Sequence, residues 1–583
     1  MPIPCRNTNE LWAFILTETL KRLGLTCAII CPGSRSTPLA VAFAQQSPDI
    51  EVISILDERS AAFFGLGRAK ATGIPAAVIC TSGTAGANFY PAVIEANESR
   101  IPLLLLTADR PAELRNSHSG QTIDQVKLYG NYPNWQAELA VPVASMAMLG
   151  YLRQTLIQAW ERTLTPIPGA VHLNIPLRDP LVPLPDGVDL TEINAKFDPE
   201  NFFAHIKTPS SPSLLPTPYS LLPHSHRGII IAGVAQPQNP EEYCRAIASL
   251  AETLNFPVLA EGLSPVRNYA FLNPYIISTY DLILRNPELA KQLTPEMVIQ
   301  IGDMPTSKEL RTWLTATSPQ YWIIDKTYQN LDPLHGKTTH LRISIEELAK
   351  GEREKGKPEV LTNYIKQWLT AENEVRSKID EVFIDIDSKA NHFLESKIAW
   401  LLPQILPQET PIFIANSMPV RDIEFFWKPN NLGIQPFFNR GANGIDGTLS
   451  TALGVAHRNQ SSIILTGDLA LLHDTNGFLI RNKFVGHLTI ILINNNGGGI
   501  FEMLPIAQFE PPFEELFATP QHIDFAQLAA TYGIEHQLIA SWQELQEKLN
   551  PLPKQGIRIL EIKTNRKADA KWRKENLGKF SKN

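Results

Sequence analysis

LTGDL at residues 465–469 and ILINNNGGG at residues 491–499 are the stretches around which the rest of the chain is organised. Each contains β-branched residues and leucine, a composition typical of a buried parallel strand. Asp468 lies at the end of the first run, and asparagines and glycines end the second. Because ligands bind at the carboxyl ends of strands in an open α/β sheet, we expect Asp468 and Asn495 to lie side by side on neighbouring strand ends.

The oxygen atoms gathered at these strand ends suit a magnesium ion. The Asp468 carboxylate, the Asn495 amide oxygen and the Gly497 carbonyl form half of an all-oxygen shell. Mg²⁺ takes few protein ligands and completes its octahedron with water and phosphate oxygens. The adjacent glycines allow backbone N–H groups to approach a diphosphate. The alternative is that the two runs are ordinary core strands ending in polar loops.

The composition is that of a globular enzyme with several domains. A chain of 583 residues predicts three or four domains, and 44% apolar with 19% charged residues is ordinary for such enzymes. The net charge of −7 argues against general nucleic-acid binding. The five cysteines lack metal-ligand spacing, so we expect buried thiols in a reducing, cytoplasmic setting. No apolar run reaches the roughly 18 residues of a membrane span, and no signal peptide is visible.

Strand-like runs recur in three blocks, which predicts an α/β protein with three doubly wound parallel sheets. In the first block they recur about every 25 residues, the spacing of βαβ units. The runs of the first block lie at residues 26–31, 51–56, 76–80, 103–107 and 171–175. Those of the second lie at residues 229–232, 257–260, 297–301 and 321–324. The third block adds runs at residues 412–415 and 557–562 to the two opening stretches.

The predicted domains comprise residues 1–185, 186–355 and 356–583. Residues 201–226 are rich in proline, serine and histidine and predict a linker, in which we interpret His224 and His226 as solvated loop residues. Residues 351–380 predict a charged helix or connector. Residues 566–583 are rich in lysine and arginine and predict a mobile, solvated tail.

Polar residues follow the strands of the first block, which predicts a second binding edge. They are Ser34, Arg35, Asp57, Glu58, Arg59, Thr81, Ser82, Thr84, Asp109 and Arg110. In the third block, Asn416 and Ser417 end a strand, and a glycine-rich loop at residues 438–447 enters a helix. Cations lie at these edges and loops, namely Arg35, Arg110, Lys308, Arg421 and Arg440. Guanidinium groups bind carboxylates through paired hydrogen bonds, so they favour an anionic ligand; the alternative for each is a surface ion pair.

Several motifs resemble those of one family. A glycine–aspartate strand end followed by an asparagine pair is similar to the fingerprint of thiamine-diphosphate enzymes, although Leu469 replaces the usual glycine. The sequence also contains PGSRSTPL (32–39), DER (57–59), TSGTA (81–85), LTADRP (106–111), NRG (439–441) and IDG (445–447). With these motifs, and with leucine at 469, the chain resembles the 2-succinyl-5-enolpyruvyl-6-hydroxy-3-cyclohexene-1-carboxylate synthases of menaquinone and phylloquinone biosynthesis.

The resemblance implies a transferase that binds thiamine diphosphate with Mg²⁺ or Mn²⁺ and acts on 2-oxoglutarate and isochorismate. In such an enzyme 2-oxoglutarate loses CO₂, and the remaining succinyl unit adds to isochorismate. The cofactor supplies this chemistry as an ylid and electron sink. Glu58 is at the position of the family's catalytic acid, which protonates the aminopyrimidine N1′. The alternative for Glu58 is an acid facing a helix N-terminal dipole.

The resemblance also implies binding roles for particular residues. The metal ligands are Asp468, Asn495 and Gly497. The cofactor-binding residues are Glu58, Asn416, Ser417, Ile445, Gly467, Asp468, Leu469, Asn495, Ile500, Phe501 and Leu504. The substrate-binding residues are Ser34, Arg35, Arg110, Gln121, Lys308, Ser417, Arg421 and Arg440. Glu309 departs from the pattern, because some relatives have a second basic residue there.

The same family implies a homodimer or homotetramer with its active sites between subunits. Three alternatives stay open on the sequence. The nearest is another thiamine-diphosphate-dependent 2-oxo acid decarboxylase or carboligase, some of which bind FAD in the middle domain. A dinucleotide-dependent oxidoreductase is disfavoured, because no G-x-G-x-x-G motif follows a predicted strand. A binding protein that lost its chemistry is disfavoured because Glu58, Asp468 and Asn495 are present.

Overall fold

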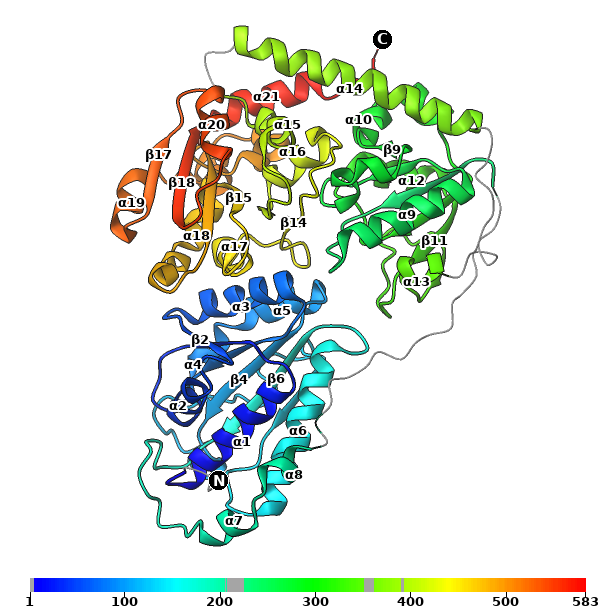
Figure 1. Cartoon of the computed structure of the whole chain (residues 1–583). Coiled ribbons are helices and arrows are strands. Elements are labelled where there is room, and N and C mark those ends of the chain that lie inside the picture. Colours follow the sequence, from blue (N-terminus) through cyan, green and yellow to red (C-terminus); the bar gives the residue numbers. More distant parts are fainter. Residues whose placement is uncertain (1–4, 205, 207–224, 351–360, 390–392, 583) are drawn as a thin grey trace. The chain divides into compact units, whose positions relative to one another are not determined.

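The computed structural model describes residues 5–204, 206, 225–350, 361–389 and 393–582 (Figure 1). It contains three six-stranded sheets whose neighbouring strands are all parallel, which confirms the predicted α/β class. Two compact units are distinguished. The first comprises Met1–Ser213, Asn439–Arg458 and His473–Val485, and the second comprises Leu214–Phe438, Asn459–Leu472 and Gly486–Asn583.

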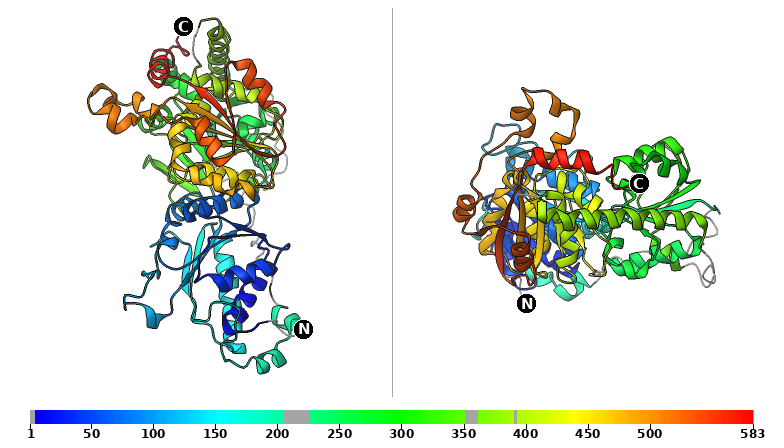
Figure 2. Two further views of the ribbon diagram at one scale, coloured as in Figure 1. Left: turned by 90° about the vertical axis from the view of Figure 1, so that its left-hand side faces the viewer. Right: turned by 90° about the horizontal axis from the view of Figure 1, so that it is seen from above.

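The first unit is built on a sheet of strand order β2-β1-β3-β4-β6-β5. Its strands are β1 (Cys27–Ile30), β2 (Glu51–Ser54), β3 (Ala76–Cys80), β4 (Leu103–Asp109), β5 (Trp135–Glu138) and β6 (Ala170–Pro176). Its helices are α1 (Thr8–Arg22), α2 (Thr37–Gln45), α3 (Glu58–Thr72), α4 (Thr84–Ala87), α5 (Tyr90–Glu98), α6 (Met146–Leu164), α7 (Thr191–Lys196) and α8 (Pro199–Phe203). Every residue of β3 and β4 is buried, because helices cover both faces of this sheet (Figure 2).

A helix from the last third of the sequence also belongs to the first unit. Helix α17 (Thr448–Ala456) packs closely on α3. A Cβ atom added to Gly67 would lie 2.1 Å from the Thr451 carbonyl oxygen, and one added to Gly454 would lie 2.2 Å from that of Phe64. Gly67 and Gly454 therefore permit the two helices to approach closely.

The second unit contains a middle sheet of order β12-β11-β10-β7-β8-β9. Its strands are β7 (Gly228–Ala232), β8 (Val258–Ala260), β9 (Ile276–Ile277), β10 (Met297–Ile301), β11 (Gln320–Ile324) and β12 (Lys337–Leu341). Its helices are α9 (Pro240–Leu254), α10 (Tyr280–Leu284), α11 (Pro287–Gln292), α12 (Lys308–Thr317) and α13 (Ile345–Lys350). Counted from its own first strand, this order is 3-2-1-4-5-6, that of dinucleotide-binding sheets.

The third sheet has the order β14-β13-β15-β16-β18-β17, which repeats the order of the first sheet strand for strand. Its strands are β13 (Ile412–Ile414), β14 (Pro436–Phe437), β15 (Ser462–Gly467), β16 (His487–Asn494), β17 (Glu535–Leu538) and β18 (Gly556–Lys563). Its helices are α14 (Asn363–Lys389), α15 (Glu395–Ile405), α16 (Met418–Phe426), α18 (Asp468–His473), α19 (Phe525–Tyr532), α20 (Trp542–Leu549) and α21 (Arg566–Asn576).

The central strands lie where the apolar runs predicted them, but the sheet edges contain strands that the sequence analysis did not predict. These are β5, β9, β12, β14 and β17. Strands β5, β12 and β17 are half-buried or exposed, and their sequences WQAE, KTTHL and EHQL contain no long apolar run. An edge strand needs only one partner and one covered face, so its composition resembles that of a loop.

The predicted mobile tail is wrong, because residues 566–576 form helix α21. Arg566, Asp569, Ala570 and Arg573 of this helix are buried. Two of the charged side chains that suggested a solvated tail, Arg566 and Arg573, are paired with buried carboxylates, which composition cannot reveal. Among the described helices, none combines the length and the hydrophobicity needed to cross a bilayer.

Part of the predicted linker is folded. Helix α8 covers residues 199–203, and its Phe202 and Phe203 are buried in the core of the first unit. His226 is exposed, as expected of a solvated loop residue. Residues 207–224, with His224, lie outside the described residues. The domain boundaries near residues 185 and 355 stay predictions.

Candidate active site

Asp468 joins the ends of two neighbouring strands of the third sheet. Strands β15 and β16 pair in register, with Gly467 opposite Ile493. Asp468 follows β15 directly and begins helix α18, and its Oδ2 accepts a hydrogen bond of 2.8 Å from the backbone N–H of Gly497. Burial raises the pKa of the Asp468 carboxyl to about 6, although hydrogen bonds from Gly497 and Leu469 oppose the rise.

The Asn495 amide presents a buried oxygen with no protein donor. Its Nδ2 donates to Glu395 Oε1 at 2.7 Å, whereas its Oδ1 is buried and has no hydrogen-bond partner in the described part of the chain. An unsatisfied buried oxygen is costly, and a bound cation would satisfy it. The amide oxygen therefore fits the predicted metal site.

Gly497 completes this set, and only glycine fits its position. Its φ of +141° lies in a region that side chains disfavour, and an added Cβ would lie 2.5 Å from the Ala518 carbonyl oxygen. No cluster of three or more His, Cys, Asp or Glu ligands occurs among the residues that the structure describes. One carboxylate with amide and carbonyl oxygens is the set expected of Mg²⁺ bound mainly through water and phosphate.

The end of β13 contributes Asn416, which is buried, and Ser417, which precedes α16. The backbone of Ser417 has φ +75°, which is rare for a residue with a side chain and is typical of functional sites. The Nη1 atom of Arg421 donates to the Ser417 carbonyl at 2.6 Å. Ser417 and Arg421, predicted as substrate-binding residues, are thus in direct contact.

Three predicted cofactor-binding residues, Ile500, Phe501 and Leu504, follow the glycine cluster. Ile500 and Phe501 lie in the 3₁₀ turn Gly499–Met503, and the Phe501 ring packs edge-on against Phe517 with centroids 5.9 Å apart. Leu504 is 46% exposed, so its side chain has surface to offer a ligand or another subunit. Phe501 has a clear packing role, whereas Leu504 does not.

Glu58 is the first residue of α3, at the carboxyl edge of the first sheet. Asp57 caps this helix by accepting a hydrogen bond of 3.1 Å from the Ser60 N–H. Glu58 itself is half-buried and lies near Cys31 and Cys80. Burial raises the pKa of these two thiols, and the charge of Glu58 raises it further. The glutamate is therefore close to Cys31, which follows β1, and to Cys80, the last residue of β3.

Arg35 lies at the same edge of the first sheet and is buried. Its Nη1 donates to the Leu177 carbonyl at 2.9 Å and lies 3.7 Å from the Asp179 carboxylate. Burial lowers the pKa of the Arg35 guanidinium, Asp179 opposes this, and the charge of Arg110 lowers the pKa further. Two guanidinium groups close enough to repel each other suit an anionic ligand.

Arg110, Gln121 and Ser82 form a hydrogen-bonded group. Arg110 Nη1 donates to Ser82 Oγ at 2.5 Å and to the Gln121 carbonyl at 2.9 Å, and Gln121 Nε2 donates to the Ser82 carbonyl at 2.9 Å. Arg115 Nε donates to the Arg110 carbonyl at 3.0 Å. Sequence reasoning noted Ser82 only as part of a polar strand end and missed Arg115, which no motif signals. Ser34 is exposed at the same edge.

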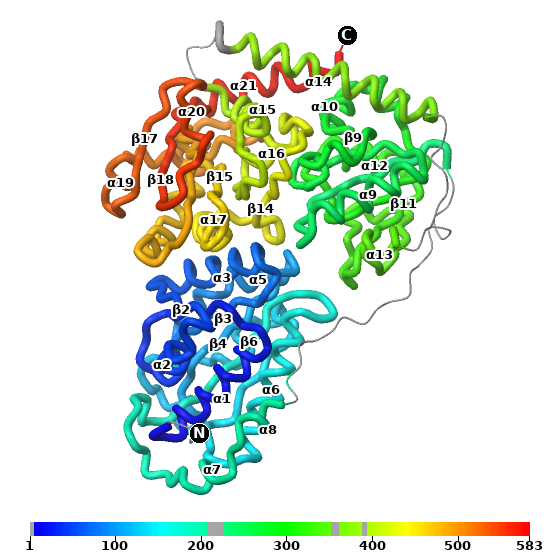
Figure 3. The backbone as a smooth tube through the Cα atoms, in the orientation of Figure 1, coloured from blue at the N-terminus to red at the C-terminus, as the bar shows by residue number. Residues whose placement is uncertain are grey.

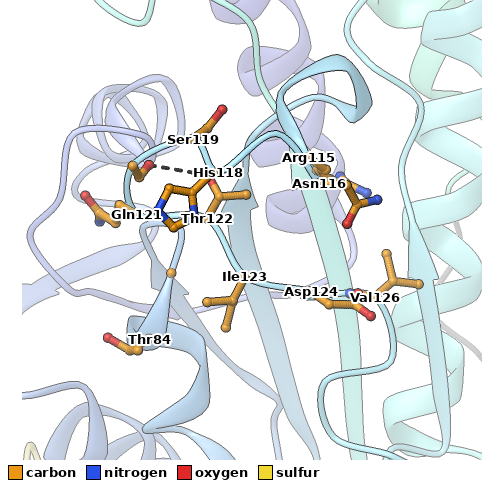
Figure 4. A pocket seen from close by; sticks show the side chains of 12 residues that line it. Thr84, Arg115, Asn116, His118, Ser119, Gln121, Thr122, Ile123, Asp124 and Val126 are labelled. Carbon is orange, nitrogen blue, oxygen red and sulfur yellow. Dashed lines mark hydrogen bonds between the residues drawn. The ribbon is translucent and has the colours of Figure 1, made fainter.

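A cavity of about 780 Å³ opens beside this group (Figure 4). Arg115 and Asn116 line one side of it, and His118 and Gln121 line the other. Its volume lies within the range of small-molecule pockets. Gln121, a predicted substrate residue, thus faces a space large enough for a small organic acid.

The glycine-rich loop that precedes α17 is held by Glu95 of α5. Glu95 is buried and accepts hydrogen bonds from the N–H groups of Gly441 at 3.0 Å and Ala442 at 2.7 Å. Arg440 and Ile445 of this loop are half-buried. Glu95 is a further residue that the sequence analysis missed, because it is more than 300 positions away from the loop.

Lys308 is the one predicted substrate residue on the middle domain. It is the first residue of α12 and is exposed, while Glu309 lies 3.7 Å from Arg285. The structure thus brings Asp468 and Gly497 into contact within the second unit, and it brings Arg35, Arg110 and Gln121 together within the first. The roles of the individual residues stay predictions.

At the switch point of the middle sheet, the loops after β7 and β10 bond to each other, since Val234 and Asp303 exchange backbone hydrogen bonds of 3.0 and 2.9 Å. A Cβ on Gly233 would lie 1.9 Å from the Asp303 carbonyl oxygen. Gly233 is therefore explained by contact between loops rather than by an approaching pyrophosphate.

Comparison with known proteins agrees with this arrangement of sheets and sites. Residues 12–128 match the family model "Thiamine pyrophosphate enzyme, N-terminal TPP binding domain". Residues 217–414 match "Middle domain of thiamine pyrophosphate", and residues 430–562 match "Thiamine pyrophosphate enzyme, C-terminal TPP binding domain".

Relatives that match over the whole chain are each named 2-succinyl-5-enolpyruvyl-6-hydroxy-3-cyclohexene-1-carboxylate synthase. The protein from Trichormus variabilis is 70% identical, with 100% of this chain and 99% of the relative aligned. That from Gloeothece citriformis is 64% identical over 100% of both chains, and that from Acaryochloris marina is 59% identical over 98% of both. The chain therefore belongs to the 2-succinyl-5-enolpyruvyl-6-hydroxy-3-cyclohexene-1-carboxylate synthase family of thiamine-diphosphate enzymes.

Proposed function

We propose that this enzyme decarboxylates 2-oxoglutarate and adds the succinyl unit to isochorismate, a transferase step of menaquinone or phylloquinone biosynthesis. The name of the relatives over their whole length supports the choice of reaction. The observation that carries the proposal is the unpartnered Asn495 oxygen beside the buried Asp468 carboxylate, at the strand ends where this family holds its metal.

Asp468, Asn495 and the Gly497 carbonyl are proposed to hold Mg²⁺, or Mn²⁺ in its place. Thiamine diphosphate, when bound, supplies the ylid and the electron sink of the reaction. The backbone around Ser417 and Gly467 is proposed to contact the cofactor, and Leu469, Asn416 and Ile500 surround it. Ile445, Phe501 and Leu504 are proposed to supply apolar surface to the bound cofactor.

Glu58 is proposed to hold a proton at N1′ of the cofactor's pyrimidine. Its half-buried position at the start of α3, close to Cys31 and Cys80, supports this role. Among the predicted site residues, Glu58 is the one that we propose to transfer a proton. The others are proposed to bind or orient the cofactor, the metal ion or the substrates.

The cations are proposed to divide between the two substrates. Arg35, Arg110, Gln121 and Ser34 bind the carboxylates and ring of isochorismate at the first sheet, with Lys308 as a further cation. Ser417, Arg421 and Arg440 bind the carboxylates of 2-oxoglutarate. Both substrates are dianions, so each requires more than one cation.

We further propose a cytoplasmic homodimer or homotetramer with active sites between subunits. The cysteines in the described residues are free, which fits a reducing compartment. Leu56, Phe509 and Leu516 are 65%, 61% and 63% exposed, and exposed apolar side chains of this size are typical of interfaces.

One assay separates the proposal from its nearest alternative, another thiamine-diphosphate-dependent decarboxylase or carboligase. CO₂ release from 2-oxoglutarate is measured with thiamine diphosphate and Mg²⁺, in the presence and absence of isochorismate. We expect rapid release only with isochorismate, with one CO₂ per adduct formed. Rapid release without isochorismate, together with an aldehyde product, would favour a simple decarboxylase.

A further inference from the structure

A buried carboxylate determines which way the Asn495 amide points. Glu395, the first residue of α15, is 1% exposed, and its Oε1 lies 2.7 Å from Asn495 Nδ2. An ionised carboxylate only accepts hydrogen bonds, so the amide must turn its nitrogen toward Glu395 and its oxygen away. If the Asn495 amide were reversed, its oxygen would face the Glu395 carboxylate, and two hydrogen-bond acceptors would lie against each other. The unpartnered Oδ1 of Asn495 is the consequence.

Glu395 is itself held from the opposite side. Thr564 Oγ1 donates to its Oε1 at 3.0 Å, and Arg573 Nη2 donates to its Oε2 at 2.8 Å. The Glu395 N–H donates to Asp569 Oδ1 at 2.9 Å. Because Glu395 and Arg573 are each 1% exposed, this ion pair is shielded from water.

Helix α21, which carries Arg573, contacts other elements of the same site (Figure 3). Arg573 Nη2 donates to Asp422 Oδ2 at 2.6 Å, and Asp422 lies on α16, the helix that follows Ser417. Arg566 Nη1 donates to the Asn496 carbonyl at 3.2 Å, in the loop that also contains Gly497. The C-terminal helix therefore contacts α15, α16 and the loop after β16, and the last two adjoin the proposed cofactor residues Ser417 and Asn495.

The adjacent residue Asn494 provides an internal comparison. Its Nδ2 also donates to a buried glutamate, Glu561 Oε1, at 2.6 Å. The Oδ1 of Asn494, however, accepts a hydrogen bond of 3.2 Å from the Asn496 N–H. Two consecutive amides are thus oriented by two buried glutamates, and the oxygen without a protein donor is that of Asn495.

We propose that Glu395 is a positioning residue of the metal site, which holds the Asn495 amide oxygen toward the cation bound by Asp468, and that Arg573 of α21 keeps Glu395 in place. This inference rests on the proposed metal ligands and assigns a role to a residue that lies 100 positions before Asn495. It also gives the C-terminal helix a function in cofactor binding.

The test compares Glu395→Gln with the matched control Glu561→Gln. Mn²⁺ affinity is measured by electron paramagnetic resonance in the full-length enzyme with thiamine diphosphate present. We expect Glu395→Gln to weaken Mn²⁺ binding about 10- to 100-fold, as loss of a residue that orients a metal ligand does. Glu561→Gln should leave the affinity unchanged, since Asn494 is not a proposed ligand.

A second test exchanges the amide and the carboxylate between positions 395 and 495. Asn495→Asp alone adds a negative charge to the ligand set, yet it should weaken Mn²⁺ binding because two carboxylates then face each other. The double variant Glu395→Gln/Asn495→Asp restores a donor opposite an acceptor, while Arg573 still meets an oxygen. It should recover most of the affinity lost in either single variant.

The inference would be overturned if Glu395→Gln bound Mn²⁺ with the wild-type affinity. It would also be overturned if the double variant bound Mn²⁺ no more tightly than the single variants. Circular dichroism and thermal unfolding show whether each variant is folded. If Glu395→Gln does not fold, the double variant decides, and its failure to fold also counts against the proposal. The variant Asp468→Ala separates the proposed metal site from the proposed role of Glu395. If Asp468→Ala still binds Mn²⁺, the metal site itself is contradicted. If Asp468→Ala loses Mn²⁺ binding while Glu395→Gln keeps the wild-type affinity, only the role of Glu395 is contradicted.

Discussion

The first and third sheets have the same strand order, but their carboxyl edges differ in the chemical groups that they present. At the third edge, Asp468 and Asn495 present oxygens whose positions are set by backbone N–H groups and buried ions. At the first edge, Arg35 and Arg110 present guanidinium groups: Arg110 donates to a hydroxyl and a carbonyl group, whereas Arg35 donates to a carbonyl group and also lies 3.7 Å from the Asp179 carboxylate. The same topology therefore presents a buried carboxylate and an unpartnered amide oxygen at one edge and two guanidinium groups at the other.

The difference lies in what surrounds the strand ends rather than in the strands. A cation site needs ligand oxygens at fixed positions, which a shielded network such as Glu395, Arg573 and Asp422 provides. A site for flexible dicarboxylates needs positive charge and donors, which arginines supply without a rigid network. The middle sheet, with its different strand order and mutually bonded loops, resembles neither edge.

The largest expected effect concerns the acid at the first edge. Glu58→Gln should retain thiamine diphosphate and metal but lower kcat about 10²- to 10⁴-fold, the usual contribution of a general acid. Steady-state kinetics and cofactor titration measure the two quantities separately. The control is Asp57→Asn, which changes the neighbouring carboxylate yet keeps a good helix cap. Full activity in Glu58→Gln would contradict the proposal that the first edge supplies the catalytic acid.

The next effect concerns the stability of the third edge. Arg573→Met should lower the free energy of unfolding by about 3–5 kcal/mol, because it leaves the buried Glu395 and Asp422 carboxylates without their cation. Chemical denaturation measures the change. Lys571→Met, on an exposed position of the same helix, is the control and should change stability little. An equal, small change in both variants would show that the network does not stabilise this edge.

A smaller effect is expected for the anion-binding edge. Arg110→Gln should raise the KM for isochorismate about 10- to 100-fold, the cost of a lost hydrogen bond between charged groups. The KM for 2-oxoglutarate should stay unchanged, since that substrate is assigned to the third sheet. Arg178→Gln, which removes an exposed ion pair with Glu113, is the matched control. Equal changes in both KM values would argue against the division of substrates between the edges.

The smallest effect concerns the contact that joins α17 to the first unit. Glu51 accepts hydrogen bonds from His457 Nε2 at 3.0 Å and Arg458 Nε at 2.6 Å. Burial would raise the pKa of Glu51, but these bonds outweigh it and lower the pKa from 4.5 to about 2. The folded state thus prefers the ionised form, so the stabilisation is complete above pH 4.5 and is lost as the pH falls toward 2.

Thermal unfolding of the wild type and of Glu51→Gln as a function of pH tests this contact. The wild type should be more stable by about 1 kcal/mol at pH 6, because solvent screens the pair in part, and the difference should vanish near pH 2. A difference that does not depend on pH would mean that Glu51 acts by packing alone.

Much of this protein follows from local sequence. The central strands are apolar runs that must be covered on both faces, and the residues at their ends are read directly from the chain. The edge strands β12 and β17 were not predicted, because one exposed face leaves no apolar pattern. Helix α21 was mistaken for a solvated tail, because charged residues are usually exposed, and only their partners show that these are buried.

The sequence by itself thus determined the sheet class, the family and the chemical groups at each strand end, because these depend on residues that are neighbours along the chain. The tertiary structure decided that α17 joins the first unit and that Asn495 turns its oxygen away from Glu395. Both features depend on contacts between residues that lie a hundred or more positions apart in the sequence. No local sequence pattern specifies which distant charged group or backbone segment a side chain will contact.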